Sequence, residues 1–134
     1  MPRESFQRDM QRLLDEVLAL GSMVDKAIAD SVEILKRQDL EAAKRLMEHD
    51  KAINEKRFAI EADTLALIAT QQPMASDLRT LAAILEIATE LERMGDYGKG
   101  IAKITLQIGS EPLIKPLIDI PRMAEKGRSM LRPY

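Results

Sequence analysis

The stretch ESFQRDMQRLLDEVLALGSMVDKAIADSVEILK, residues 4–36, decides the fold class. Its apolar residues recur in steps of four and three, which is the heptad pattern of a helix that buries one face. The residues on this seam are Phe6, Met10, Leu13, Val17, Leu20, Val24, Ala27 and Leu35, and Ser31 is the polar interruption. Charged residues fall off the seam, where water reaches them. The stretch therefore predicts a long amphipathic helix, which Gly21-Ser22 bends without ending it.

The composition supports helices throughout the chain. Of the 134 residues, 46% are hydrophobic and only 3% are aromatic, and the chain contains no Cys. Aliphatic residues without aromatic partners favour helices over strands, and the length predicts one globular domain. The lack of Cys excludes a disulfide framework, a thiolate metal site and a Cys nucleophile.

The charge balance limits the classes of partner. The net charge of −2 comes from 20 basic and 22 acidic residues without a long block of one sign. A protein that binds the nucleic-acid backbone is more basic than this, so we expect no nucleic-acid partner. No stretch approaches the roughly 20 apolar residues of a membrane span, and the first ten residues lack the apolar run of a secretory signal. We therefore expect a cytoplasmic protein without direct membrane insertion.

Two further helices follow. Asp39 is placed to cap a helix from Leu40 to about Thr70, and Pro73 ends that helix. Ser76 is the predicted N-cap of a third helix that continues to about Ile108. The predicted seam of the second helix contains Ala43, Met47, Phe58, Leu65 and Ile68, with Asp50, Asn54 and Glu61 on or beside it. The predicted stripe of the third contains Leu81, Ile84, Leu85, Ile87, Ala88, Leu91, Met94, Ile101, Ile104 and Ile108.

These elements predict an all-α fold, an antiparallel bundle of three long helices with short turns. At about 1.5 Å per residue, each helix is roughly 45 Å long. A linker rich in Gly and Pro covers residues 109–116, and residues 117–131 begin a short, partial fourth helix. That segment has no partner of its own, so it must pack on the bundle or on another molecule.

Two pairs of polar side chains are candidate metal ligands. Glu92 and Asp96 are four residues apart, so both carboxylates project from one side of the third helix. Asp50 and Asn54 repeat this spacing on the second helix, and Asp50 and Asp96 each lie 23 residues from Pro73, at similar heights. Such carboxylates bind or bridge hard cations, but the same spacing is common in ordinary solvated charge clusters. Rotation about each helix axis decides whether the two pairs converge.

Gly95, Gly98 and Gly100 interrupt the third helix. Each glycine costs about 1 kcal/mol relative to Ala in a helix interior, so a compensating interaction is expected. A missing side chain lets a neighbouring backbone, a partner or a ligand approach closely at Gly95 and Gly98. Tight helix packing and ligand binding are both compatible with this pattern.

Motifs of common enzyme classes are missing from this sequence. His49 is the only histidine, and Leu46 stands where a Glu-x-x-His motif of a di-iron bundle needs Glu. Neither the Gly-x-Ser-x-Gly motif of hydrolases nor the P-loop motif of nucleotide triphosphatases occurs in it. We therefore expect a protein that is not an enzyme, with His49 on the solvent side.

Four sequence motifs resemble one family. QQPMASDLR at 71–79 and ELERMGD at 90–96 carry the likeness, and LGSMV at 20–24 and DKAIN at 50–54 extend it. Together they resemble the PhoU family of phosphate-uptake regulators, from about Phe6 to Leu131.

The resemblance implies a cytoplasmic, all-helical, non-enzymatic regulator that represses the phosphate-starvation response. Its implied partners are a sensor histidine kinase and the ATPase subunit of a phosphate ABC transporter. Some family members bind multinuclear iron or zinc clusters through acidic motifs. Glu92 and Asp96 match such a motif, and Asp50 and Asn54 match the pattern of the second helix, with a less secure ligand role. Arg79 resembles a structural or partner-contact position.

The length departs from the family pattern of two tandem three-helix repeats. Residues 1–108 resemble one complete repeat, and residues 109–134 resemble the linker and the truncated first helix of a second. The second Glu-Arg-x-Gly-Asp motif does not occur. Since one repeat alone leaves apolar surface uncovered, we expect a homodimer or an exchange of helices between chains.

Three functions remain open from the sequence. The first is a regulator of phosphate uptake and phosphate-starvation signalling that acts by protein contacts, with an acidic metal site as an accessory. The second is a purely structural interaction module without metal. The third is a metal-dependent phosphohydrolase, which needs an activated water and a substrate pocket. Only the carboxylates favour the third.

Overall fold

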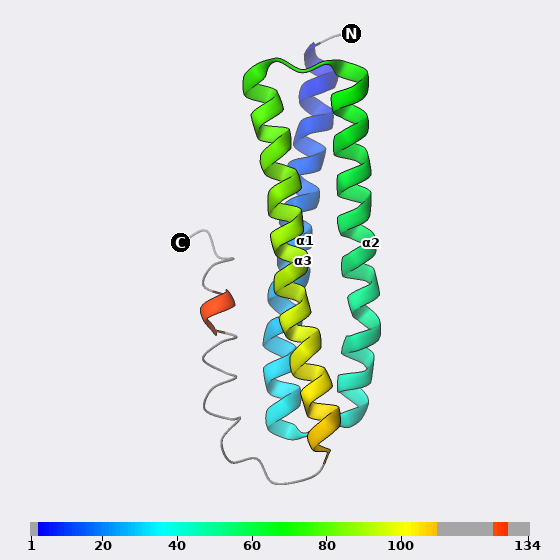
Figure 1. Ribbon diagram of the computed structural model, residues 1–134, viewed down its shortest axis with the longest axis vertical. Helices are drawn as coiled ribbons and strands as arrows, with labels where there is room; N and C mark the ends of the chain where they lie inside the picture. The colour runs from blue at the N-terminus through cyan, green and yellow to red at the C-terminus, as the bar shows by residue number, and fades with distance from the viewer. Residues whose placement is uncertain (1–2, 110–124, 129–134) are drawn as a thin grey trace.

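The computed structural model describes residues 3–109 and 125–128. Three long helices, α1 (Arg3–Arg37), α2 (Leu40–Gln71) and α3 (Ala75–Ile108), lie side by side, with α2 antiparallel to the other two (Figure 1). The predicted all-α, three-helix bundle is therefore confirmed. Residues 125–128 form the described part of the predicted fourth helix. The predicted linker and the rest of that helix lie outside the described residues.

The seam of α1 forms one wall of the core, as its heptad pattern predicts. Leu20, Val24 and Leu35 are fully buried. The polar interruption, Ser31, is also buried, and its hydroxyl donates a hydrogen bond to the Ile28 carbonyl at 2.6 Å. The helix runs through Gly21 without ending. A polar residue on the seam is tolerated here because its donor is satisfied within the helix.

The predicted seam of α2 is partly wrong, and one residue of the α3 stripe is also misplaced. Phe58 and Leu65 of α2 are 59% and 56% exposed, and Ile87 of α3 is 46% exposed. The core-facing stripe of α2 instead passes through two polar residues. A prediction that selects only apolar positions therefore places the stripe too far toward the solvent side of the helix. The buried residues of α2 are Ala43, Asp50, Ile53, Ile60, Thr64 and Leu67.

The N-termini of α2 and α3 are capped in different ways. The Asp39 carboxylate accepts a hydrogen bond from the Ala42 backbone N–H at 3.1 Å, which confirms the predicted cap of α2. The predicted cap at Ser76 is wrong, because α3 begins at Ala75, two residues earlier than that cap implies, and its N-cap residue, Met74, makes no side-chain cap. Asp77 in the first turn accepts from Arg3 at 2.5 Å instead. The carboxylate there suits the positive end of the helix.

Helices α1 and α3 approach each other closely at Gly98. A Cβ placed on Gly98 would lie 3.3 Å from the carbonyl oxygen of Ala27. A Cβ on Gly95 would make ordinary contacts, 3.6 Å from Ile53 and 3.8 Å from Asp50 Oδ1, whereas one on Gly100 would meet open space. Helix packing therefore accounts for Gly98.

The described part of the fourth helix packs against α1 and α3. The Arg128 Nε atom pairs with Asp25 Oδ1 at 2.8 Å. A Cβ on Gly127 would lie 3.9 Å from the Ile28 side chain and 4.0 Å from that of Met94. Within the described residues, no helix is long and apolar enough to cross a membrane.

Candidate functional site

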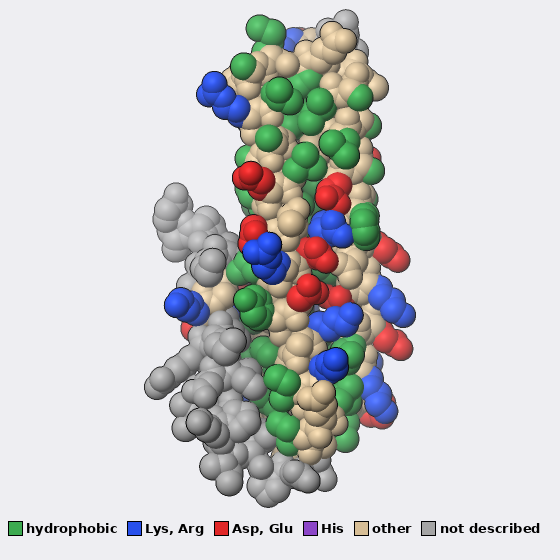
Figure 2. Space-filling model, viewed as in Figure 1, with side chains coloured by type: hydrophobic (Ala, Val, Ile, Leu, Met, Phe, Trp, Pro, Cys, Tyr) green, Lys and Arg blue, Asp and Glu red, His purple; other side chains and the backbone are tan. Residues whose placement is uncertain are grey.

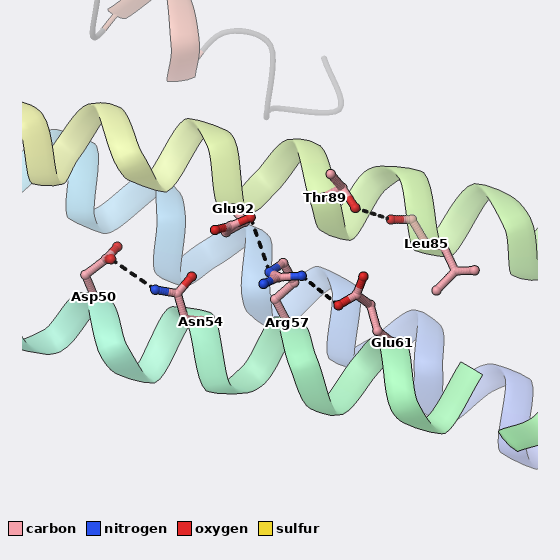
Figure 3. A network of polar contacts seen from close by, with 7 residues as sticks. All are labelled: Asp50, Asn54, Arg57, Glu61, Leu85, Thr89 and Glu92. Atoms are coloured by element: carbon pink, nitrogen blue, oxygen red, sulfur yellow. Dashed lines mark hydrogen bonds and ion pairs between the residues drawn. The ribbon is translucent and has the colours of Figure 1, made fainter. Parts of the chain in front are cut away.

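The four predicted ligands lie on the sides of α2 and α3 that face each other. The Asn54 amide donates to Asp50 Oδ2 at 3.3 Å, one turn apart on α2 (Figure 3). Lys99 of α3 reaches across the helix pair, with its Nζ atom 3.8 Å from Asp50 Oδ2. Since Lys99 lies one turn beyond Asp96, the prediction that Asp50 and Asp96 sit at similar heights is correct.

Asp50 is the buried member of this group, only 5% exposed. Burial raises the pKa of the Asp50 carboxyl above its ordinary value, and the nearby charge of Asp96 adds to this rise. The Lys99 ammonium and the Asn54 amide act in the opposite direction. The two partners of the charged form thus offset only part of the rise in pKa that burial causes.

Arg57, which the sequence analysis does not single out, pairs with the carboxylates of Glu61 and Glu92. Its Nε atom lies 3.3 Å from Glu92 Oε2, and its Nη1 atom lies 2.6 Å from Glu61 Oε2 (Figure 3). Its guanidinium also lies over the Phe58 ring, 4.1 Å from the centroid. Arg57 and Glu61 are spaced as a helical ion pair, and this spacing was the available signal in the sequence.

The arrangement provides oxygen donors but also supplies their counter-ions. Among the described residues, no three His, Cys, Asp or Glu side chains cluster closely enough to hold a metal ion. Glu92 is turned to Arg57, and Asp50 faces Lys99. As arranged, the residues do not fit a multinuclear iron or zinc cluster, because Arg57 and Lys99 occupy the neighbourhood that a cation would need. What the geometry provides is a polar connection between α2 and α3.

The raised pKa of Asp50 gives a pH-dependent prediction. A carboxyl with a higher pKa in the folded state keeps its proton longer than in the unfolded chain, so stability falls as pH rises from the ordinary carboxyl pKa through the folded pKa. Asp50→Asn removes this dependence. We expect the free energy of unfolding of Asp50→Asn, relative to the parent protein, to increase with pH across this window in urea titrations with chelator present. The exposed carboxylate variant Asp15→Asn is the control, and a relative stability of Asp50→Asn that falls with pH contradicts the prediction.

Comparison with known proteins places this bundle in a family. Residues 17–105 match the family described as the PhoU domain. The chain is 36% identical over 133 residues to the phosphate-specific transport system accessory protein PhoU homolog of Clostridium acetobutylicum, covering 98% of this chain and 61% of that protein. It is 33% identical over 120 residues to the PhoU protein of Escherichia coli strain K12, covering 87% and 50%.

A solved structure agrees with the sequence comparisons. The bundle resembles the crystal structure of the phosphate transport system regulatory protein PhoU from Streptococcus pneumoniae, with a TM-score of 0.83 and 33% identity. The match covers 94% of this chain and 59% of that protein. The chain thus spans between half and about three-fifths of the length of these relatives. With the family match over most of the bundle, the chain belongs to the PhoU family.

Proposed function

We propose that this chain is a regulatory accessory protein of a phosphate transport system and acts through protein contacts rather than catalysis. The match of the bundle, over 94% of the chain, to a protein described as a phosphate transport system regulatory protein carries this proposal. The relatives are also named as accessory proteins of such a system. The proposed partners are the transporter's ATPase subunit and a sensor histidine kinase, both on the cytoplasmic side.

Complementation tests the proposal. A bacterium deleted for its own PhoU-family gene is expected to express a phosphate-starvation reporter even in phosphate-rich medium. Expression of this chain is expected to restore repression by at least tenfold. An unrepressed reporter, at a protein level that immunoblotting shows to equal that of the bacterium's own protein, contradicts the proposal.

A homodimer is the second part of the proposal. Exposed apolar side chains along α1 and α3, such as Leu18 at 70% and Ile87 at 46%, support an assembly in solution. Sedimentation velocity at micromolar concentration is expected to give twice the mass of the chain. A strict monomer over that range removes the dimer.

The metal site of Glu92, Asp96, Asp50 and Asn54 stays a prediction, and the ion pairs of Arg57 and Lys99 favour the metal-free alternative. If iron or zinc is held there, elemental analysis finds metal in the purified protein and loses it in the double variant Glu92→Gln/Asp96→Asn. In the metal-free alternative, both proteins carry the same background and chelator leaves the melting temperature unchanged. Phosphatase turnover with added metals would instead support the phosphohydrolase alternative.

A further inference from the structure

One long surface is formed by the adjoining sides of α2 and α3. Arg57 of α2 meets Glu92 of α3, and Asp50 meets Lys99, which fixes how the two helices face each other. Positions spaced by three and four residues from these contacts continue along both helices. We call this surface the α2/α3 face: Asp50, Asn54, Arg57, Glu61, Leu65 and Ile68 on α2, and Leu78, Ala82, Leu85, Thr89, Glu92, Asp96, Lys99 and Lys103 on α3.

The half of this face next to the turn between the helices is apolar. Leu65 and Leu78 are 56% and 42% exposed, and Met74 in the turn is 72% exposed. Ala82 is exposed, and Leu85 is half-buried. Figure 2 shows hydrophobic side chains over the upper parts of α2 and α3 and charged side chains below them. Clustered, exposed apolar residues with a polar border are typical of an interaction site.

The other half of the face carries more negative than positive charge. Glu61 and Glu92 share the single guanidinium of Arg57. Asp96 is exposed and makes no ion pair within residues 3–109 and 125–128. With Lys103, four carboxylates stand against three cations: Asp50, Glu61, Glu92 and Asp96 against Arg57, Lys99 and Lys103. This excess favours a positively charged ligand beside the apolar half.

The other sides of the bundle lack this combination. The exposed apolar residues Leu18 and Ile87 border the groove between α1 and α3, where Arg128 already pairs with Asp25. The groove between α1 and α2 is also lined by apolar residues, such as Met23, Ala27 and Leu46, but its charges show no negative excess. Three basic residues stand there against three acidic ones: Lys26, Arg37 and Arg45 against Asp30, Glu33 and Asp39. The described contacts of residues 125–128 fall on α1 and on the far side of α3.

We propose that the α2/α3 face docks an amphipathic helix of a partner protein, apolar along one side and rich in Lys or Arg at one end. The apolar end packs over Leu65, Leu78 and Leu85, and the basic end lies over Glu61, Glu92 and Asp96. At about 1.5 Å per residue, a helix of about 18 residues spans both halves. A helix laid into an apolar groove is a common mode of recognition. The inference rests on the proposed function, since it names the surface through which a regulator makes contact.

Two synthetic peptides test this assignment. One is an 18-residue amphipathic helix with Leu along one side and four Lys at one end, and the other replaces those Lys by Glu. Titration calorimetry is expected to show that the Lys peptide binds at least tenfold more tightly than the Glu peptide. The difference is expected to shrink at high salt, because exposed charges are screened. Equal binding of the two peptides overturns the proposal.

Variants of the chain locate the binding surface. The double variant Leu65→Ser/Leu78→Ser is expected to weaken binding of the Lys peptide at least tenfold. The control is Leu18→Ser on α1, an exposed leucine outside the α2/α3 face, and this variant is expected to bind unchanged. All three side chains are exposed, so melting curves are expected to show folded proteins. Equal loss in the control, or no loss in the double variant, overturns the proposal.

Two further outcomes separate the alternatives. If sedimentation shows a dimer that Leu65→Ser/Leu78→Ser alone disrupts, the face binds a second copy of the chain and the helix proposal is wrong. If the double variant represses the phosphate-starvation reporter as well as the parent chain does, the docking surface is also wrong while the proposed function stands. If peptide binding follows the predictions but the parent chain does not repress the reporter, only the proposed function fails.

Discussion

Gly98→Ala is expected to lower the free energy of unfolding by about 2 kcal/mol, because an extra methyl group overpacks the interface between α1 and α3. The new Cβ would lie 3.3 Å from the Ala27 carbonyl oxygen and 3.5 Å from the Ile28 nitrogen. These are backbone atoms of a neighbouring helix, so relief requires the α1 backbone to move by a few tenths of an ångström at this point. The loss exceeds the gain in helix propensity from replacing glycine. Urea unfolding followed by circular dichroism measures the change.

The matched control is two residues further along the same helix. A Cβ on Gly100 would meet nothing within 4 Å. Gly100→Ala is therefore expected to raise the free energy of unfolding by up to about 1 kcal/mol through helix propensity alone. Similar stabilities for the two variants would show that α1 and α3 separate easily, contrary to the close approach at Gly98.

Arg57→Met is expected to lower the free energy of unfolding by about 2 kcal/mol, since it leaves two carboxylates without their shared cation. The Arg57 side chain is 14% exposed, and those of Glu61 and Glu92 are 31% and 29% exposed. Partial burial makes the group stronger than a surface pair and weaker than a fully buried one. Met retains the apolar stem, so urea unfolding reports the loss of charge.

Arg93→Met provides the comparison for Arg57→Met. Arg93 pairs with Glu90 at 3.4 Å, and the two side chains are 67% and 59% exposed. An exposed pair of this kind contributes between zero and about 1 kcal/mol. A loss from Arg93→Met equal to that from Arg57→Met would mean that Arg57 acts as an ordinary surface charge.

The sequence predicts α1 far better than α2, for a physical reason. The seam of α1 is a continuous row of apolar residues, so its period and its buried face are both visible. The buried face of α2 passes through Asp50 and Thr64, and these contribute no apolar signal. Phe58 and Leu65 lie on the solvent side and supply a false one. The hydrophobic pattern alone therefore predicts that α2 is a helix, but not which of its faces is buried.

The sequence predicts how far along the bundle the candidate site lies, but it does not predict which side chains form ion pairs there. Counting from Pro73 places Asp50 and Asp96 at the same level, and the contact of Lys99 with Asp50 agrees. The partners of the carboxylates depend on rotation about each axis and on the reach of long side chains. The spacing of Glu92 and Asp96 could not show that Glu92 turns to Arg57.

The sparse apolar face of α2 has a consequence for how the bundle opens. This helix buries six residues, two of them polar, whereas α1 buries eleven. The Thr64 hydroxyl is buried without a hydrogen-bond partner in the described structure, which lowers the stability of α2 further. Local unfolding follows the least stable contacts first. We expect the backbone amides of α2 to exchange with solvent through partial opening, while α1 and α3 stay paired and protected until the whole domain unfolds.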